Sequence, residues 1–122
     1  MLEMKELLEI FNTLDMKMGN NQKNFIVVEF ADGINQRETA MLLESPEIVA
    51  RFDKLIFCAA DALGAVGGLH ILKANFNLVP DAISGICSSS PLHVRELHSF
   101  TDAPVFNSAD LKLDQMAEIL LN

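Results

Sequence analysis

The fold class follows from the stretch KLIFCAADALGAVGGLHILKANFNLVPDAISGI, residues 54–86. Its first six residues form an apolar run typical of a buried strand, and alanine-rich sequence typical of a helix extends from Asp61 to about Ala74. Residues 75–77 (NFN) then indicate a turn, and residues 78–86 contain the next strand. A strand, a helix and a second strand in this order predict two parallel strands joined by a helical crossover.

The same alternation continues on both sides of this stretch. Apolar residues recur at helical spacing from Met4 to Met18, and residues 25–30 (FIVVEF) form another apolar run typical of a strand. A helix is expected over residues 35–43, and a second one begins at Pro46 because proline is favoured in the first helical turn. Towards the C-terminus we expect a helix over residues 92–100, a short strand over residues 104–106 and a final helix capped by Ser108 or Asp110.

A single α/β domain over residues 1–122 follows from this order of elements. Near-continuous apolar strands separated by helices indicate a parallel sheet that is covered on both faces. The sequence therefore predicts three layers, with a mostly parallel four-stranded sheet between helices, as in Rossmann-like folds. A chain of 122 residues suits one such domain with a modest core.

The composition narrows the range of partners and the cellular compartment. Nine Lys and Arg residues against 17 Asp and Glu give a net charge of -8, which disfavours nucleic acid or anionic lipid as the main partner. A small phosphorylated ligand needs only a few local donors and stays compatible with this charge. The N-terminus is too charged for a secretory segment, and no apolar run reaches the length of a membrane span. Cys58 and Cys87 follow no metal-ligand spacing, so a cytoplasmic protein with two reduced thiols is expected.

Glu29 is the most specific single candidate for a functional residue, because it is a carboxylate inside the apolar run 25–30. Burying such a charge costs several kcal/mol unless it is paired or bound to a metal. One interpretation is a catalytic carboxylate that holds magnesium or substrate near the end of the strand. The other is an ion pair with Arg37, Lys54 or Arg95, or an edge position that is open to water.

Polar residues are crowded directly after this first strand, at the edge where parallel sheets bind ligands. Arg37 could clamp a phosphate or a carboxylate with two hydrogen bonds, or it could form a local Arg–Glu pair on a solvated helix face. Asp32 could orient a ligand, or it could cap the helix that follows. The candidate residues for substrate or nucleotide binding in this segment are Asp32, Gly33, Asn35, Gln36 and Glu38, with Arg37 as a catalytic candidate.

Small and polar residues also follow the second and third expected strands. Asp61 is a candidate ligand residue or, as is more usual at such a position, the N-cap of a helix. Three hydroxyl groups and free amides at a helix start can cradle an anion, which makes Ser88, Ser89 and Ser90 binding candidates, whereas Ser90 could also simply cap the helix. Ser84 belongs to the same expected edge of the sheet.

The order of these segments resembles that of the dethiobiotin synthetase family of P-loop NTPases. VVEFADGI (residues 27–34) is similar to the strand and turn VVEGxGG of that family. LIFCAADALGAVGGLHILKANFNLVPDAISGI (residues 55–86) resembles the stretch that runs through LGxxNHxLLT to GLxxxGxxxN, and APVFNSADL (residues 103–111) is similar to the late xPxLGxIPxL. The likeness in order extends over roughly residues 5–120 and rests on loose motifs.

The resemblance implies roles for several residues and two ligands. Glu29 matches the strand glutamate that helps to hold magnesium and substrate, and Gly33 matches the second glycine of the turn. Ser84 or Gly85 falls where the family has an asparagine that contacts the nucleotide base. The implied cofactors are Mg²⁺ and ATP, and the implied ligands are a nucleotide or a small carboxylate. The chain departs from the family pattern at Gly68, where the family has histidine, and at Phe30, where it has glycine.

The largest departure from the family is the phosphate-binding loop, because GxxxxGK[ST] does not occur in the sequence. The chain therefore resembles the C-terminal half of such an enzyme. An ATP-dependent ligase or kinase activity would need a P-loop supplied upstream or by a P-loop-bearing partner. Because the phosphate-loop strand is missing between the strands at residues 25–30 and 54–59, these two pair directly or leave an unpaired edge, and a homodimer is the other expected assembly. The alternative is a binding or assembly module without catalysis, and a thiol enzyme using Cys58 or Cys87 is the weakest hypothesis.

Overall fold

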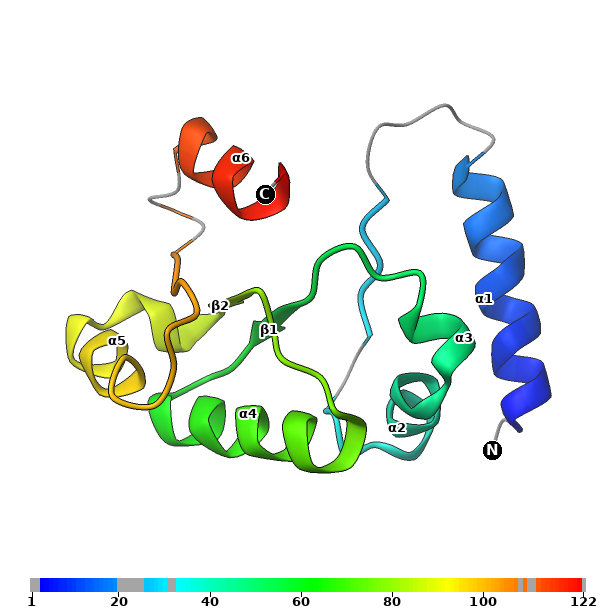
Figure 1. Cartoon of the computed structure of the whole chain (residues 1–122), viewed down its shortest axis with the longest axis horizontal. Coiled ribbons are helices and arrows are strands. Elements are labelled where there is room, and N and C mark those ends of the chain that lie inside the picture. Colours follow the sequence, from blue (N-terminus) through cyan, green and yellow to red (C-terminus); the bar gives the residue numbers. More distant parts are fainter. Residues whose placement is uncertain (1–2, 20–25, 31–32, 108, 110–111, 122) are drawn as a thin grey trace. The chain divides into compact units, whose positions relative to one another are not determined.

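The structure is a computed structural model that describes residues 3–19, 26–30, 33–107, 109 and 112–121. The chain is mostly helical, and its described residues contain one two-stranded sheet (Figure 1). Two units, Met1–Phe52 and Asp53–Asn122, are each held together by their own contacts. That residues 1–122 make one domain stays a prediction.

The described residues of the unit Met1–Phe52 form three helices. The serine at position 45 ends one helix and starts the next, since its backbone N–H donates to the carbonyl of Leu42 and its Oγ accepts from the backbone N–H of Ile48 at 3.4 Å. Pro46 takes the first position of the new helix, as predicted. The helices are α1 (Met4–Gly19), α2 (Arg37–Glu44) and α3 (Pro46–Val49).

The core of this unit combines aliphatic and aromatic side chains. Leu7, Leu43 and Ile48 are buried. The ring of Phe30 lies beside two others, with centroids 6.3 Å from Phe11 and 5.6 Å from Phe52. The guanidinium group of Arg51 covers the Phe11 ring at 5.1 Å from its centroid. The aromatic rings therefore hold together segments that are far apart in the sequence.

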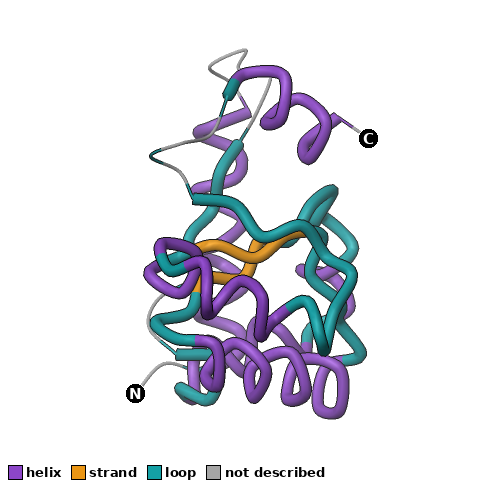
Figure 2. Tube along the Cα trace, turned by 90° about the vertical axis from the view of Figure 1, so that its left-hand side faces the viewer, coloured by secondary structure: helices purple, strands orange, loops and turns teal. Residues whose placement is uncertain are grey.

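The unit Asp53–Asn122 contains the sheet. Strands β1 (Ile56–Cys58) and β2 (Ala82–Ser84) pair in parallel, and α4 (Ala62–Phe76) connects them (Figure 2). Two hydrogen bonds join the residues that directly precede the two strands. The backbone N–H of Leu55 donates to Asp81 Oδ2 at 2.8 Å, and the N–H of Asp81 donates to the carbonyl of Leu55 at 2.8 Å. The predicted strand–helix–strand order of this stretch is confirmed.

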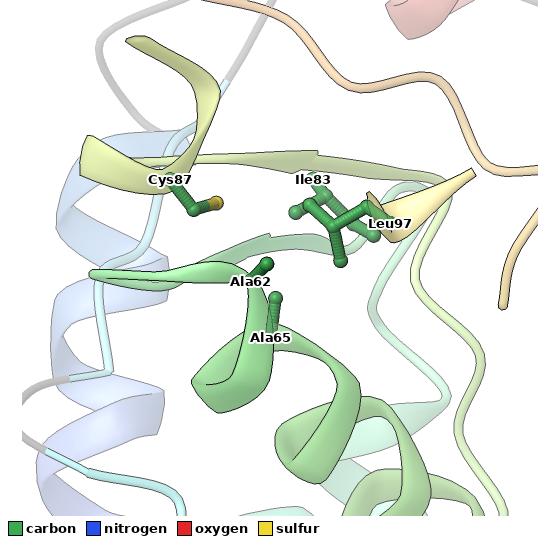
Figure 3. Close-up of a cluster of buried hydrophobic side chains, with 5 residues drawn as sticks. All are labelled: Ala62, Ala65, Ile83, Cys87 and Leu97. Carbon is green, nitrogen blue, oxygen red and sulfur yellow. The ribbon is translucent and has the colours of Figure 1, made fainter. Parts of the chain in front are cut away.

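The helix α4 packs on the sheet through small side chains. Ala62 and Ala65 face Ile83, Cys87 and Leu97, and these five side chains form the buried core of the unit (Figure 3). The remaining elements are the short 3₁₀ helix η1 (Ile86–Ser89), α5 (Pro91–Leu97) and α6 (Leu113–Leu121).

Gly68 lies at a close approach between α4 and β1. A Cβ atom at Gly68 would lie 2.2 Å from Cζ of Phe57, so no larger residue fits without moving the ring. This glycine therefore allows close helix–sheet packing.

The predicted three-layer, four-stranded sheet is wrong. Residues 26–30, the described part of the first expected strand, form no strand, and the side chain of Val27 is 91% exposed. Residues 104–106 contribute a single bridge, between Val105 and Ile83, instead of a strand. An apolar run becomes a strand only where a neighbouring backbone accepts its hydrogen bonds, and Phe30 is instead packed into the aromatic cluster. The predicted caps of the last helix, Ser108 and Asp110, lie outside the described residues.

Candidate functional site

The carboxyl end of the two-stranded sheet brings several of the predicted site residues together. The backbone N–H of Ala59 donates to the carbonyl of Ser84 at 3.1 Å, and the N–H of Cys87 donates to the carbonyl of Ala59 at 3.0 Å. Gly85 makes this junction possible, because its φ is +92° and a Cβ atom there would lie 2.6 Å from the carbonyl oxygen of Ala59. The predicted residues at this edge are Asp61, Ser84, Ser88, Ser89 and Ser90.

The first turn of α4 is capped by two side chains. Asp61 Oδ1 accepts a hydrogen bond from the backbone N–H of Gly64 at 2.6 Å, so Asp61 is the N-cap that was its more usual interpretation. His93 Nδ1 accepts from the backbone N–H of Ala62 at 3.3 Å. No spacing signal could have found this bond, since its two residues are 31 positions apart.

The serine hydroxyl groups of this edge bond to the protein's own backbone. Ser84 Oγ donates to the carbonyl of Phe106 at 2.8 Å. Ser88 Oγ and Ser89 Oγ donate to the carbonyls of Gly85 and Ile86, at 2.6 and 2.7 Å. Ser90 takes the N-cap position of α5, but its side chain makes no capping bond. The hydroxyl protons of Ser84, Ser88 and Ser89 are thus directed at carbonyl oxygens.

The two thiols differ in their surroundings. Cys87 is completely buried, and its Sγ donates to the carbonyl of Ser84 at 3.2 Å. Burial raises the pKa of the Cys87 thiol above its ordinary value, the nearby Asp61 carboxylate acts in the same direction, and a hydrogen bond from the backbone of Ala59 acts against it. Cys58 is exposed on β1. A nucleophilic thiol needs a lowered pKa, so Cys87 has the properties of a structural cysteine.

Large apolar side chains lie exposed around the same end of the sheet. Leu63 in α4 is 82% exposed, Ile86 in η1 is 74% exposed and Leu92 in α5 is 67% exposed. Each of them is the sequence neighbour of a residue that makes a hydrogen bond at this end of the sheet. Leu63 follows Ala62, Ile86 precedes Cys87, and Leu92 precedes His93. The elements α4, η1 and α5 therefore each expose one large apolar side chain next to a residue of this junction.

The predicted residues of the other unit lie on exposed, locally bonded segments. Glu29 is exposed. Arg37 NH2 lies 3.6 Å from Glu3 Oε1 and its NH1 lies 3.4 Å from Glu38 Oε1, so the expected Arg–Glu pair is present. The backbone N–H of Gln36 donates to the carbonyl of Gly33 at 3.0 Å in the turn before α2, where Asn35 is exposed. Asp32 lies outside the described residues.

The fit of a magnesium ion can be judged from the donor groups. Within the described segments, no group of three or more His, Cys, Asp and Glu side chains could hold a metal ion. Glu29, the expected ligand, is exposed without such companions. The described residues thus do not fit a magnesium site, and Mg²⁺ and ATP stay predictions.

No family model, curated protein or solved structure matches this chain. The likeness to dethiobiotin synthetases stays a resemblance in the order of sequence segments. None of the helices in the described part is both long and apolar enough to span a membrane.

Proposed function

We propose that the chain is a non-catalytic binding or assembly module. One observation carries the proposal: at the carboxyl end of the sheet Asp61, Ser84, Ser88 and Ser89 are bonded to the protein's own backbone, whereas the elements α4, η1 and α5 that meet there expose Leu63, Ile86 and Leu92. Such a surface favours contact with another protein over chemistry on a small anion.

Energetics support this choice. A phosphate bound by Ser88 and Ser89 would have to replace two short hydrogen bonds, each worth about 1 kcal/mol net. Electrostatic catalysis also needs donors that already point at the substrate. In contrast, covering an exposed leucine or isoleucine side chain contributes about 1.5–3 kcal/mol. The apolar side chains are therefore the larger source of binding free energy at this end of the sheet.

The module is proposed to act in the cytoplasm. Cys58 and Cys87 are both free thiols, as is usual in a reducing compartment.

Calorimetric titration with magnesium-ATP tests the proposal against the nucleotide-binding alternative. A non-catalytic module should give no binding heat beyond dilution. Binding with a micromolar Kd, about 8 kcal/mol, would overturn the proposal if Glu29→Gln abolished it. Glu47→Gln is the matched control, because Glu47 is an exposed glutamate of the same unit whose carboxylate lies 3.5 Å from Arg51. Binding that both variants retain would also overturn the proposal, but it would place the ligand away from Glu29.

A further inference from the structure

A side chain of α5, His93, is bonded to the first turn of α4. The backbone N–H of Ala62 donates to Nδ1 of His93 at 3.3 Å, and the histidine is partly buried. Ala62 is the first residue of α4, a position whose backbone N–H has no acceptor inside the helix. Within the described part of the chain, the ring nitrogen of His93 is the acceptor that satisfies this donor.

This bond exists only while Nδ1 of His93 carries no proton. Nδ1 accepts through its lone pair, so the proton of the neutral ring lies on Nε2. When the ring takes up a second proton, both of its nitrogens become donors, and Nδ1–H then faces the N–H of Ala62. Histidine is the side chain that ordinarily gains a proton between about pH 8 and pH 5. Acidification in this range therefore removes the acceptor from the start of α4.

The two ends of α5 are held to different degrees. At its end, Leu97 is completely buried in the core of the unit. At its start, Ser90 makes no capping bond through its side chain, Pro91 has no backbone N–H, and Leu92 is 67% exposed. The bond to His93 thus lies in the part of α5 that has the weaker attachment.

We propose that His93 is a pH-sensitive link between α4 and α5. The neutral ring holds the first turn of α5 against the start of α4, and protonation releases that turn while Leu97 keeps the end of α5 in the core. The inference goes beyond the proposed binding function and does not depend on it. The helix α5 has a bound arrangement at neutral pH and a released one in acid.

The surroundings of His93 can compensate the charge of a protonated ring. The Asp61 carboxylate directly precedes Ala62, and Glu96 lies three residues after His93 on the neighbouring part of the helix surface, so both attract the charged ring, whereas the positive end of the α4 dipole repels it. Arg95 lies two residues after His93, on a different side of α5. Cys87 of η1 is uncharged in this range, since burial raises the pKa of its thiol. The other charged or titratable groups of α4, His70 and Lys73, lie about 12 Å or more along the helix from Ala62.

Amide hydrogen exchange followed by NMR at about pH 7.5 and about pH 5.5 tests the link. We expect the protection of the Ala62 amide, corrected for the intrinsic exchange rate, to fall about fivefold in acid. The Gly64 amide is the internal reference, because it donates to Asp61 Oδ1 in the same turn and should keep its protection. Equal protection of Ala62 at both pH values would overturn the proposal. A parallel loss at Gly64 would also overturn it, since the whole turn would then be opening.

Two substitutions of His93 separate the hydrogen bond from the titration. His93→Asn places Oδ1 where Nδ1 lies, and this acceptor does not titrate, so the Ala62 amide should stay protected at both pH values. His93→Gln carries its polar atoms one carbon further and should leave the Ala62 amide unprotected at both. His70→Asn and His98→Asn remove exposed histidines and should keep the wild-type response. A fall in protection that persists in His93→Asn, or that disappears in His70→Asn or His98→Asn, would contradict the link.

The position of the proton in the wild-type ring gives a test that needs no substitution. Long-range proton–nitrogen correlation spectra distinguish the two neutral tautomers of histidine. At neutral pH we expect the proton of His93 on Nε2. A ring that carries its proton on Nδ1 could not accept from Ala62 and would overturn the proposal.

Discussion

The two units of the chain bury their side chains in different ways. In Asp53–Asn122 the backbone itself is close-packed, because Gly85 touches Ala59 and Gly68 touches the ring of Phe57. In Met1–Phe52 the core includes aromatic rings whose centroids lie about 6 Å apart, such as those of Phe11 and Phe30 at 6.3 Å. Close packing of backbone leaves no room for one extra methyl group, whereas a cluster of partly buried rings can adjust. The sheet-bearing unit should therefore be the less tolerant of small substitutions.

The largest effect is expected for Gly85→Ala. The added methyl group would lie 2.6 Å from a backbone oxygen at a φ of +92°, a conformation that alanine rarely adopts. We expect a loss of about 3 kcal/mol or more in the free energy of unfolding, measured by urea denaturation. Gly33→Ala is the control in the other unit, where the nearest atom would be 3.9 Å away, and it should change stability by less than about 0.5 kcal/mol. Equal losses in both variants would contradict the comparison.

A smaller loss, about 2 kcal/mol, is expected for Gly68→Ala, since the clash is with the end of a side chain. The Phe57→Leu substitution shortens that side chain, so the double variant should recover part of the loss. A double-mutant cycle measures the coupling. Purely additive effects would show that the contact between Gly68 and Phe57 does not set the helix–sheet distance.

The ring cluster should respond more weakly. Phe30→Leu keeps an apolar side chain but loses the ring contacts with Phe11 and Phe52, and we expect a cost of about 1 kcal/mol. Urea denaturation of the variant gives this number directly. If Phe30→Leu lowered the free energy of unfolding more than Gly68→Ala does, the unit Met1–Phe52 would be the less tolerant of substitution, contrary to the comparison.

Two helix caps sharpen the comparison further. Asp61 accepts from Gly64 at 2.6 Å, whereas Ser45 accepts from Ile48 at 3.4 Å, near the limit of a hydrogen bond. Asp61→Ala should cost about 1 kcal/mol, and Ser45→Ala should cost less than half as much. Thermal unfolding of the two variants measures both costs. A larger cost for Ser45→Ala would show that the length of the capping hydrogen bond does not determine how much a cap stabilises its helix.

The smallest effect concerns pH. Burial raises the pKa of the Cys87 thiol above its ordinary value of 9.0, so the folded chain keeps this proton to higher pH than the unfolded chain does. The resulting stability is fully present below pH 9.0 and is lost as pH rises through the folded-state pKa. Unfolding free energies measured between neutral and alkaline pH should show this loss in wild type and in Cys58→Ala, but not in Cys87→Ala.

Local signals account for the parts of the fold that could be predicted. Asp61 before α4, and Ser45 with Pro46 before α3, act on backbone groups within three residues, so the sequence alone identifies them. The run 26–30 has strand composition, but its conformation depends on the packing of Phe30 against Phe11 and Phe52, which are distant in sequence.

The candidate site, too, could be predicted only as far as it depends on residues close together in the sequence. Serines at the end of a strand were predictable, whereas the direction of their hydroxyl protons depends on the local backbone conformation around Gly85. The bond between His93 and Ala62 depends on how α5 packs against α4, which no short-range pattern encodes.

The paired hydrogen bonds between Leu55 and Asp81 bear on the order in which the chain folds. They join residues 26 positions apart, so they form only after the intervening loop has closed, at an entropic cost. The helix α4 needs only local contacts and shortens that loop as it forms. We therefore expect α4 to be structured in the folding transition state and the hydrogen bonds between Leu55 and Asp81 to form after it. Substitutions at Asp81 would then act mainly by speeding unfolding, and those that weaken α4 by slowing folding.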